Sequence, residues 1–128
     1  MRNSILLLIL IASTSLFAQK EKGVTLKTKI GDINGILLTP EENPTKTVVL
    51  IIAGSGPTDM NGNNPMMQNN SLKMLAEGIV ASGIAVLRYD KRGAASSVGA
   101  VQKEEDLRFE SYINDAIGWI GFLGNDKH

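Results

Sequence analysis

The 128-residue sequence contains no cysteine and a single histidine. The lack of cysteine excludes a disulfide scaffold, a zinc finger and a thiol nucleophile. Neither sign of charge is in excess, because 13 basic residues balance 13 acidic ones. The sequence therefore has no net charge that would attract it to nucleic acid or to an anionic membrane. A hydrophobic content of 43% indicates a folded domain rather than a disordered tail.

The first 18 residues have the features of a secretory signal peptide. Arg2 supplies a positive charge, residues 5–12 form an unbroken apolar run, and Ala18 is a small residue ahead of a cleavage point. The apolar run is much shorter than the ~20 residues that span a bilayer, which favours cleavage over a stable membrane anchor. We therefore predict export, with the protein periplasmic or secreted after signal cleavage near Ala18.

The elements that follow are predicted to form an α/β fold. A strand pair is expected within residues 24–39. The apolar, β-branched run at residues 47–53 predicts a strand buried on both faces of a largely parallel sheet, and residues 84–90 are expected to form a second buried strand. Apolar residues at helical spacing predict helices at 72–80 and 109–123, so strands and helices alternate as in a layered α/β domain. The face that the second helix is expected to bury consists of Phe109, Tyr112, Ile113, Ala116, Ile117, Ile120 and Leu123.

The turn at residues 54–57 follows the first buried strand, where ligands of open α/β sheets gather. A dinucleotide-binding turn would need glycine in place of Asp59, and the G-K-[ST] of a phosphate-binding loop is absent. A nucleophile elbow at Ser55 would need glycine in place of both Ala53 and Pro57. Two interpretations remain: a turn that presents backbone N–H groups to a ligand oxygen, and a tight turn chosen only for its geometry.

Three segments together resemble the amino-terminal half of an α/β-hydrolase: VVLIIAGSGPTDMNGNNP, NSLKMLAEGIVASGIAVLRYDKRG and FESYINDAIGWIGFL. Within that superfamily the chain is similar to exported serine esterases of the serine-aminopeptidase-like group. The resemblance implies a three-layer hydrolase-type sheet in residues 19–128, truncated before the nucleophile elbow. In this superfamily the serine, the acid and the histidine follow in that order further along the chain. All three are therefore expected downstream, and His128 is expected to be incidental.

The resemblance also implies roles for residues near the two strand ends. The backbone N–H of Ser55, with Gly56 beside it, is expected to form part of an oxyanion hole. The loop over the active site is expected to be shaped by Asp59, Asn61, Gly62 and Asn63. A structural turn is expected at Asp90, Arg92 and Gly93, with salt bridges by Arg88, Asp90 and Arg92 and no substrate contact. The family pattern R-G-x-G-x-S has alanine here at Ala95, and alanine adopts positive φ less readily than glycine.

The resemblance therefore implies a part of a serine hydrolase that acts on small carboxylic esters by acyl transfer to water. It implies no metal and no organic cofactor, no nucleic-acid partner, and a carboxyl-terminal half of the same fold as the missing partner. The alternative is a non-catalytic envelope protein, or a pseudogene product, derived from half of a hydrolase.

Overall fold

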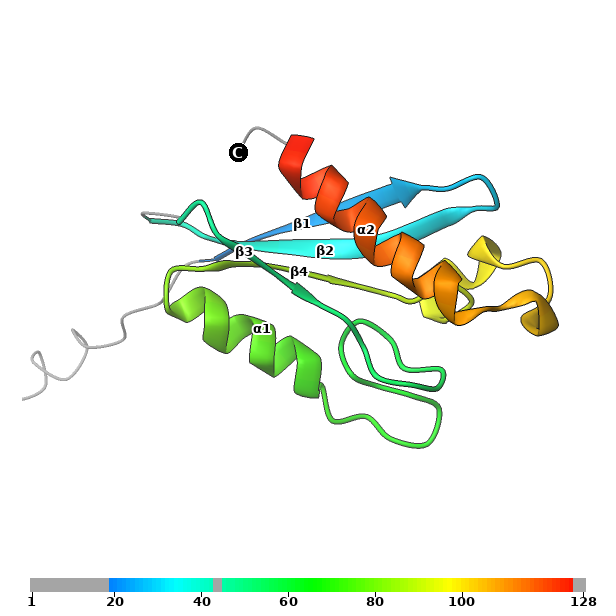
Figure 1. Ribbon diagram of the computed structural model, residues 1–128. Coiled ribbons are helices and arrows are strands. Elements are labelled where there is room, and N and C mark those ends of the chain that lie inside the picture. Colours follow the sequence, from blue (N-terminus) through cyan, green and yellow to red (C-terminus); the bar gives the residue numbers. More distant parts are fainter. Residues whose placement is uncertain (1–18, 43–44, 126–128) are drawn as a thin grey trace, which may run out of the picture.

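The computed structural model describes residues 19–42 and 45–125 (Figure 1). The predicted signal peptide and His128 lie outside the described residues. Four strands are present: β1 (Gln19–Lys27), β2 (Asp32–Pro40), β3 (Val48–Ile51) and β4 (Ala85–Tyr89). The helices are α1 (Ser71–Ala81) and α2 (Phe109–Asn125), with short 3-10 helices at Ala95–Ala100 and Glu104–Asp106. Within these ranges no helix is both long and apolar enough to span a membrane.

The strands form one mixed sheet in the order β1-β2-β4-β3. β1 pairs with β2, and β2 with β4, in antiparallel fashion, whereas β3 and β4 are parallel. The prediction of a largely parallel sheet is therefore wrong for these four strands. Residues 28–31 are too few for the crossover that parallel strands require, so β1 and β2 form a hairpin. The connection from β3 to β4 contains α1 and is long enough for a parallel pair.

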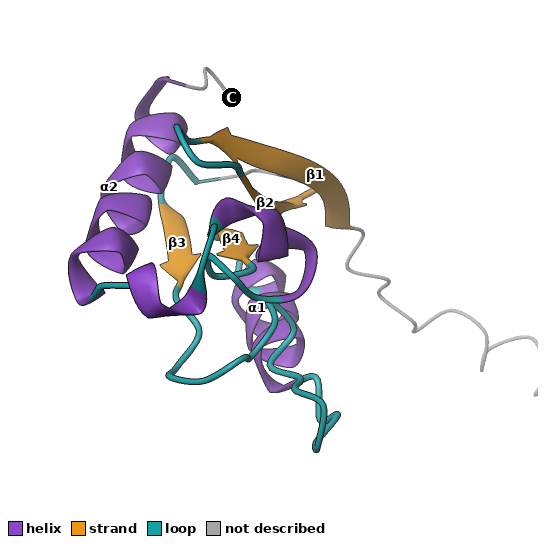
Figure 2. Cartoon of the chain, turned by 90° about the vertical axis from the view of Figure 1, so that its right-hand side faces the viewer, coloured by secondary structure: helices purple, strands orange, loops and turns teal. Residues whose placement is uncertain are grey.

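Helices cover both faces of the sheet, as predicted for a three-layer fold (Figures 1 and 2). Successive side chains of β4 point to opposite faces, so Val86 joins the core beneath α1 and Leu87 joins the core beneath α2. All five residues of β4 are buried, which explains why this run is apolar without alternation.

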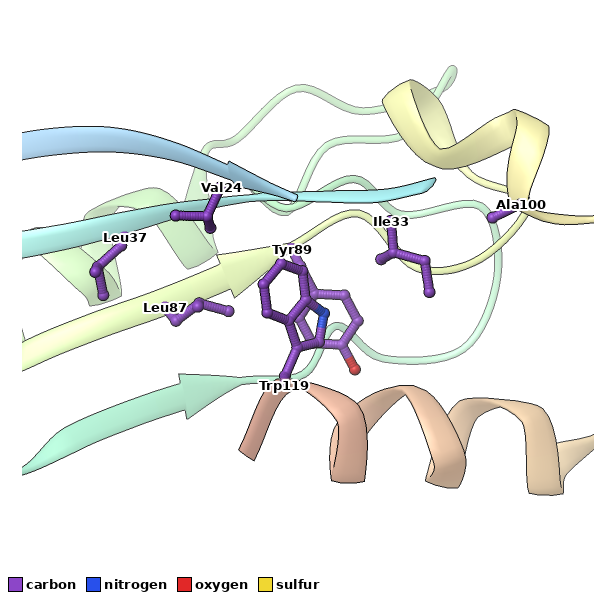
Figure 3. Packing of buried hydrophobic residues seen from close by; sticks show 7 residues of the cluster. All are labelled: Val24, Ile33, Leu37, Leu87, Tyr89, Ala100 and Trp119. Atoms are coloured by element: carbon purple, nitrogen blue, oxygen red, sulfur yellow. The ribbon is translucent and has the colours of Figure 1, made fainter. Parts of the chain in front are cut away.

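Trp119 fills the core between α2 and the sheet (Figure 3). Its side chain is fully buried, with the ring centroid 5.6 Å from that of Tyr89 and 5.3 Å from that of Phe122. Gly35 makes room for the indole, since a Cβ at this position would lie 3.4 Å from the ring and 2.8 Å from the carbonyl oxygen of Arg88. Trp119 is thus a packing residue.

The face of α2 that is buried differs from the predicted one. Asp115 and Trp119 are the buried residues of this helix. The predicted face includes four exposed residues, here called the α2 stripe: Phe109, Ile113, Ile117 and Ile120, between 45% and 75% exposed. Apolar side chains lie on two sides of α2, so periodicity could not distinguish the side that meets the sheet from the side that does not.

β3 is an edge strand of the sheet, and among the described residues its outer edge pairs with no strand. The apolar residue that follows it, Ile52, is 54% exposed. Exposed strand edges and apolar patches promote association with other chains. The edge of β3 and the α2 stripe are therefore the surfaces most prone to self-association.

We expect residues 19–128, produced alone, to form oligomers or aggregates. Ile117→Lys should shift the chain towards monomer, because full burial of one isoleucine stabilises a contact by about 1.5–3 kcal/mol. Asn114→Lys is the matched control, since it adds the same charge to an exposed position of α2 outside the stripe. Size-exclusion chromatography with light scattering measures the outcome. A monomeric wild-type chain, or equal effects of the two lysines, would contradict this prediction.

Candidate functional site

The carboxyl ends of β3 and β4 lie together at the right-hand end of the sheet in Figure 1. A pocket of about 340 Å³ lies near them, between the loop that precedes α1 and the turn that follows β4. Its lining residues are Pro57, Asp59, Asn63, Asn64, Pro65, Gln68, Gly93, Ala94 and Ala95. The pocket therefore brings together Asp59 and Asn63 of the predicted active-site loop and Gly93 of the predicted structural turn.

The turn after β3 is exposed to solvent at Gly54, Ser55 and Gly56. Gly56 has φ +85°, a conformation that suits glycine because any Cβ would be strained there. Lys91 donates hydrogen bonds from Nζ to the carbonyl oxygens of Gly54 and Gly56. Within the described part of the chain, the N–H groups of Ser55 and Gly56 have no hydrogen-bond partner. These N–H groups can therefore donate to a ligand.

The predicted active-site loop is folded on itself by Asp59. Its Oδ1 accepts hydrogen bonds from the N–H groups of Asn61 and Asn63, both at 2.8 Å. Gly62 has φ +92° and passes so close to α1 that a Cβ would lie 2.5 Å from Oγ of Ser71. These contacts give the loop a defined shape beside the pocket.

Asn61 attaches this loop to α1 and to β4. Its carbonyl oxygen accepts the N–H groups of Leu72 (3.1 Å) and Lys73 (3.3 Å) at the start of α1. Its Oδ1 accepts a hydrogen bond of 3.3 Å from Nε of Arg88. The side chain of Asn70, which directly precedes α1, makes no capping hydrogen bond, and the carbonyl of Asn61 accepts from two N–H groups at the start of the helix instead.

Asp90 connects the active-site loop to the turn after β4. One carboxylate oxygen accepts the N–H of Met60 at 2.7 Å. The other accepts both the N–H and the hydroxyl of Ser96, at 2.9 and 2.5 Å. Sequence reasoning missed these two partners of Asp90. A serine six residues after a strand-end aspartate is too general a pattern to have revealed them.

Arg92 connects the same turn to α2. Its Nε and Nη2 donate to the two carboxylate oxygens of Asp115, at 3.0 and 2.5 Å, and its Nη1 donates to the carbonyl of Ala100 at 2.6 Å. Both members of this ion pair are buried. Sequence reasoning missed Asp115, because an aspartate in a helix is ordinarily exposed and is buried only when it is paired.

Arg88, Asp90 and Arg92, the three residues expected to form salt bridges, do not line the pocket. Arg88 is buried on the α1 side of the sheet, with Nη2 3.7 Å from a carboxylate oxygen of Glu21. Arg92 forms the expected salt bridge, with Asp115, but the one expected of Asp90 is wrong: among the described residues this carboxylate accepts hydrogen bonds only from Met60 and Ser96. Among residues 19–42 and 45–125, no three acidic, histidine or cysteine side chains are grouped to hold a metal ion.

Ala95 adopts the conformation for which glycine is suited, with φ +42°. This is the position at which the hydrolase pattern has glycine. A left-handed conformation costs an alanine roughly 1–2 kcal/mol. The departure from the pattern therefore leaves the backbone shape in place and strains it.

We expect Ala95→Gly to stabilise the chain by about 1 kcal/mol, because glycine adopts positive φ without strain. Ala94→Gly is the matched control: Ala94 has an extended backbone and is buried, so glycine there should destabilise by roughly 0.5–1 kcal/mol. Urea-induced unfolding in the Ile117→Lys background measures both free energies. A destabilising Ala95→Gly would contradict the strain at this position.

No family model matches the chain, and no curated protein matches it in sequence. Solved structures do match the fold. A cold-adapted esterase from an Arctic intertidal metagenomic library aligns with a TM-score of 0.52 at 18% identity, over 83% of this chain and 44% of the esterase. An α/β serine hydrolase without a lid from Xanthomonas campestris aligns with a TM-score of 0.55 at 18% identity, over 84% of this chain and 47% of that chain.

A larger enzyme, the acylaminoacyl peptidase of Pyrococcus horikoshii, aligns with a TM-score of 0.54 at 19% identity. This alignment covers 91% of the present chain and 17% of the peptidase. The chain thus spans less than half the length of each of these structures. The fold of residues 19–42 and 45–125 therefore corresponds to part of an α/β-hydrolase fold.

Proposed function

We propose that this chain is part of a serine hydrolase that transfers the acyl group of a carboxylic ester to water. The observation that carries the proposal is the exposed turn after β3, where the N–H of Ser55 has no partner among the described residues. An oxyanion hole requires such a donor at the edge of a pocket. The pocket lined by Pro57 and Gly93 is at this edge of the sheet.

In the proposed reaction, a serine outside this chain attacks the ester carbonyl, and a histidine accepts the hydroxyl proton. The carbonyl oxygen becomes an oxyanion, which accepts a hydrogen bond from the N–H of Ser55. The intermediate collapses and releases the alcohol, which takes up the proton from the histidine. Water then attacks the acyl-enzyme in the same way and releases the carboxylic acid, which regenerates the serine.

The proposed source of that serine and histidine is a carboxyl-terminal half of the same fold. Its first strand would pair with the free edge of β3 and satisfy the backbone groups there. Apolar side chains of the same half would cover the α2 stripe, whose exposed area favours a partner surface. The proposal extends to export by the segment before Gln19, which amino-terminal sequencing of the secreted or periplasmic protein would test.

We expect Ser55→Ala to leave kcat of the full-length protein within about tenfold, or 1.4 kcal/mol, because the N–H is retained. Ser55→Pro should lower kcat by roughly 10²–10³, since proline has no N–H to donate. Hydrolysis of a p-nitrophenyl ester measures both variants, with circular dichroism to verify that each is folded. If the alanine variant loses as much activity as the proline variant, the hydroxyl is the active group and the proposed backbone role is wrong.

Residues 19–128 alone should not hydrolyse p-nitrophenyl esters faster than buffer. The single histidine, His128, does not fit the order in which hydrolases of this type carry their serine, acid and histidine. Without a serine–histidine pair the nucleophile is not activated. Turnover that survives purification and disappears in Ser55→Ala would contradict this expectation and would make Ser55 itself the nucleophile.

A further inference from the structure

Lys91 is buried beside the turn that presents the N–H of Ser55. It is the second residue after the end of β4, is 8% exposed, and donates from Nζ to the carbonyl oxygens of Gly54 and, at 2.7 Å, Gly56. These residues are 37 and 35 positions away in the sequence. The contact arises because β3 and β4 are parallel neighbours, whose carboxyl ends meet at the same edge of the sheet.

The two bonds from Lys91 are the only hydrogen bonds that hold the turn within the described residues. No other one involves residues 54–57 outside the strand pairing. Gly56 supports the arrangement with φ +85°, a conformation that glycine adopts without strain. Without the ammonium, no hydrogen bond in the described part of the chain would fix the orientation of these peptide groups.

The bond to Gly54 determines where the N–H of Ser55 points. No cis peptide bond is present in the described chain. In a trans peptide the C=O of one residue and the N–H of the next point in opposite directions across the same plane. Since Lys91 binds the carbonyl of Gly54, the N–H of Ser55 points away from Lys91, and Ser55 itself is an exposed residue.

The surroundings of Lys91 keep its ammonium in place. The ring of Tyr112 on α2 lies with its centroid 5.9 Å from Nζ, within the range of a cation–π contact. Desolvation by burial lowers the pKa of the Lys91 ammonium below its ordinary value. The lysine is therefore held between two backbone carbonyls and an aromatic ring, at a distance from bulk water.

We propose that Lys91 is a positioning residue for the oxyanion hole: by binding the carbonyl oxygens of Gly54 and Gly56, it orients the N–H of Ser55 towards the substrate oxygen. This inference rests on the proposed function. The negative charge on the substrate oxygen develops only in the transition state. A misoriented donor therefore weakens binding of the transition state more than binding of the substrate, and the loss should appear in kcat rather than in KM. Complete loss of an oxyanion donor lowers kcat by about 10²–10³, so loss of its orientation should lower kcat roughly ten- to hundredfold.

The experiment compares Lys91→Met and Lys91→Cys with wild type in the full-length protein. Lys73→Met is the matched control, because among the described residues the side chain of Lys73 makes only an exposed pair with Glu77, and its backbone N–H is unchanged in the variant. The lack of cysteine in this sequence lets the thiol at position 91 be alkylated selectively in this part of the protein. Aminoethylation restores an ammonium at nearly the length of lysine, whereas ethylation adds a neutral group of similar size.

Two readouts are taken from each protein. One is kcat and KM for a p-nitrophenyl ester, and the other is the NMR chemical shift of the Gly54 and Gly56 carbonyl carbons and of the Ser55 amide. We expect Lys91→Met to lower kcat ten- to hundredfold with KM within about threefold, and to shift all three signals. Aminoethylation of Lys91→Cys should restore both kcat and the chemical shifts, and ethylation should restore neither.

The outcomes separate this inference from the proposed function. If the carbonyl chemical shifts are unchanged in Lys91→Met, then Lys91 does not hold the Gly54 and Gly56 carbonyls, whatever the activity of the variant. Shifted signals with an active enzyme and unchanged kcat would overturn the positioning role. A third outcome is that the signals shift in Lys91→Met and are restored by aminoethylation of Lys91→Cys, while the wild type hydrolyses no ester. In that case Lys91 does hold the two carbonyls, and the proposed esterase function is wrong.

Discussion

The carboxylate of Asp90 accepts three hydrogen bonds from two loops that are separated in the sequence. One oxygen binds Met60 of the loop before α1, and the other binds Ser96 of the turn after β4. Hydrogen bonds to a charged group contribute about 1.5–3 kcal/mol each, more than neutral ones. Because Asp90 directly follows β4, it fixes both walls of the pocket to the most buried strand of the sheet. The shape of the candidate site thus depends on this one carboxylate.

The ion pair between Arg92 and Asp115 extends the same support to α2. Its bidentate geometry and the third bond to Ala100 occupy most of the donors of the guanidinium, as a buried charge requires. One turn further along the helix, Trp119 packs between α2 and the sheet. The helix is therefore held on its buried side at two successive turns, by charge and by an aromatic ring.

Much of the fold could be predicted from the residue pattern, because burial on both faces leaves a clear signature in short strands. The run at β4 is apolar at every position but Arg88 and Tyr89, and Gly83 after α1 has the positive φ expected of a helix-ending glycine. The buried side of α2 could not be predicted, since both sides are apolar. At Ala95 the sequence shows an alanine where the hydrolase pattern has glycine. The structure shows that this alanine has the positive φ that glycine adopts readily.

The site was predictable only where its shape depends on neighbouring residues. The loop around Asp59 and Gly62 is held by hydrogen bonds between residues close together in the sequence, and its asparagine and glycine content predicts such a loop. Lys91 gave no such signal. A lysine after a strand resembles any solvated residue, and its carbonyl partners are more than 30 residues away. Contacts of this kind follow from strand order, which pattern reasoning did not determine.

The strand order also has a consequence for how the chain is built from its amino terminus. Of the four described strands, β4 comes latest in the sequence, yet it lies in the interior of the sheet between β2 and β3. Before residues 85–89 emerge during synthesis, the β1–β2 hairpin can form, but β3 has no neighbour to pair with. The pairing of β3 with β4 closes a loop of more than 30 residues, and such long-range closure is slow compared with hairpin formation. The residues of the turn that carries Ser55 are therefore synthesised before β4 and Lys91, and the turn lacks the contacts that hold it until those residues have emerged.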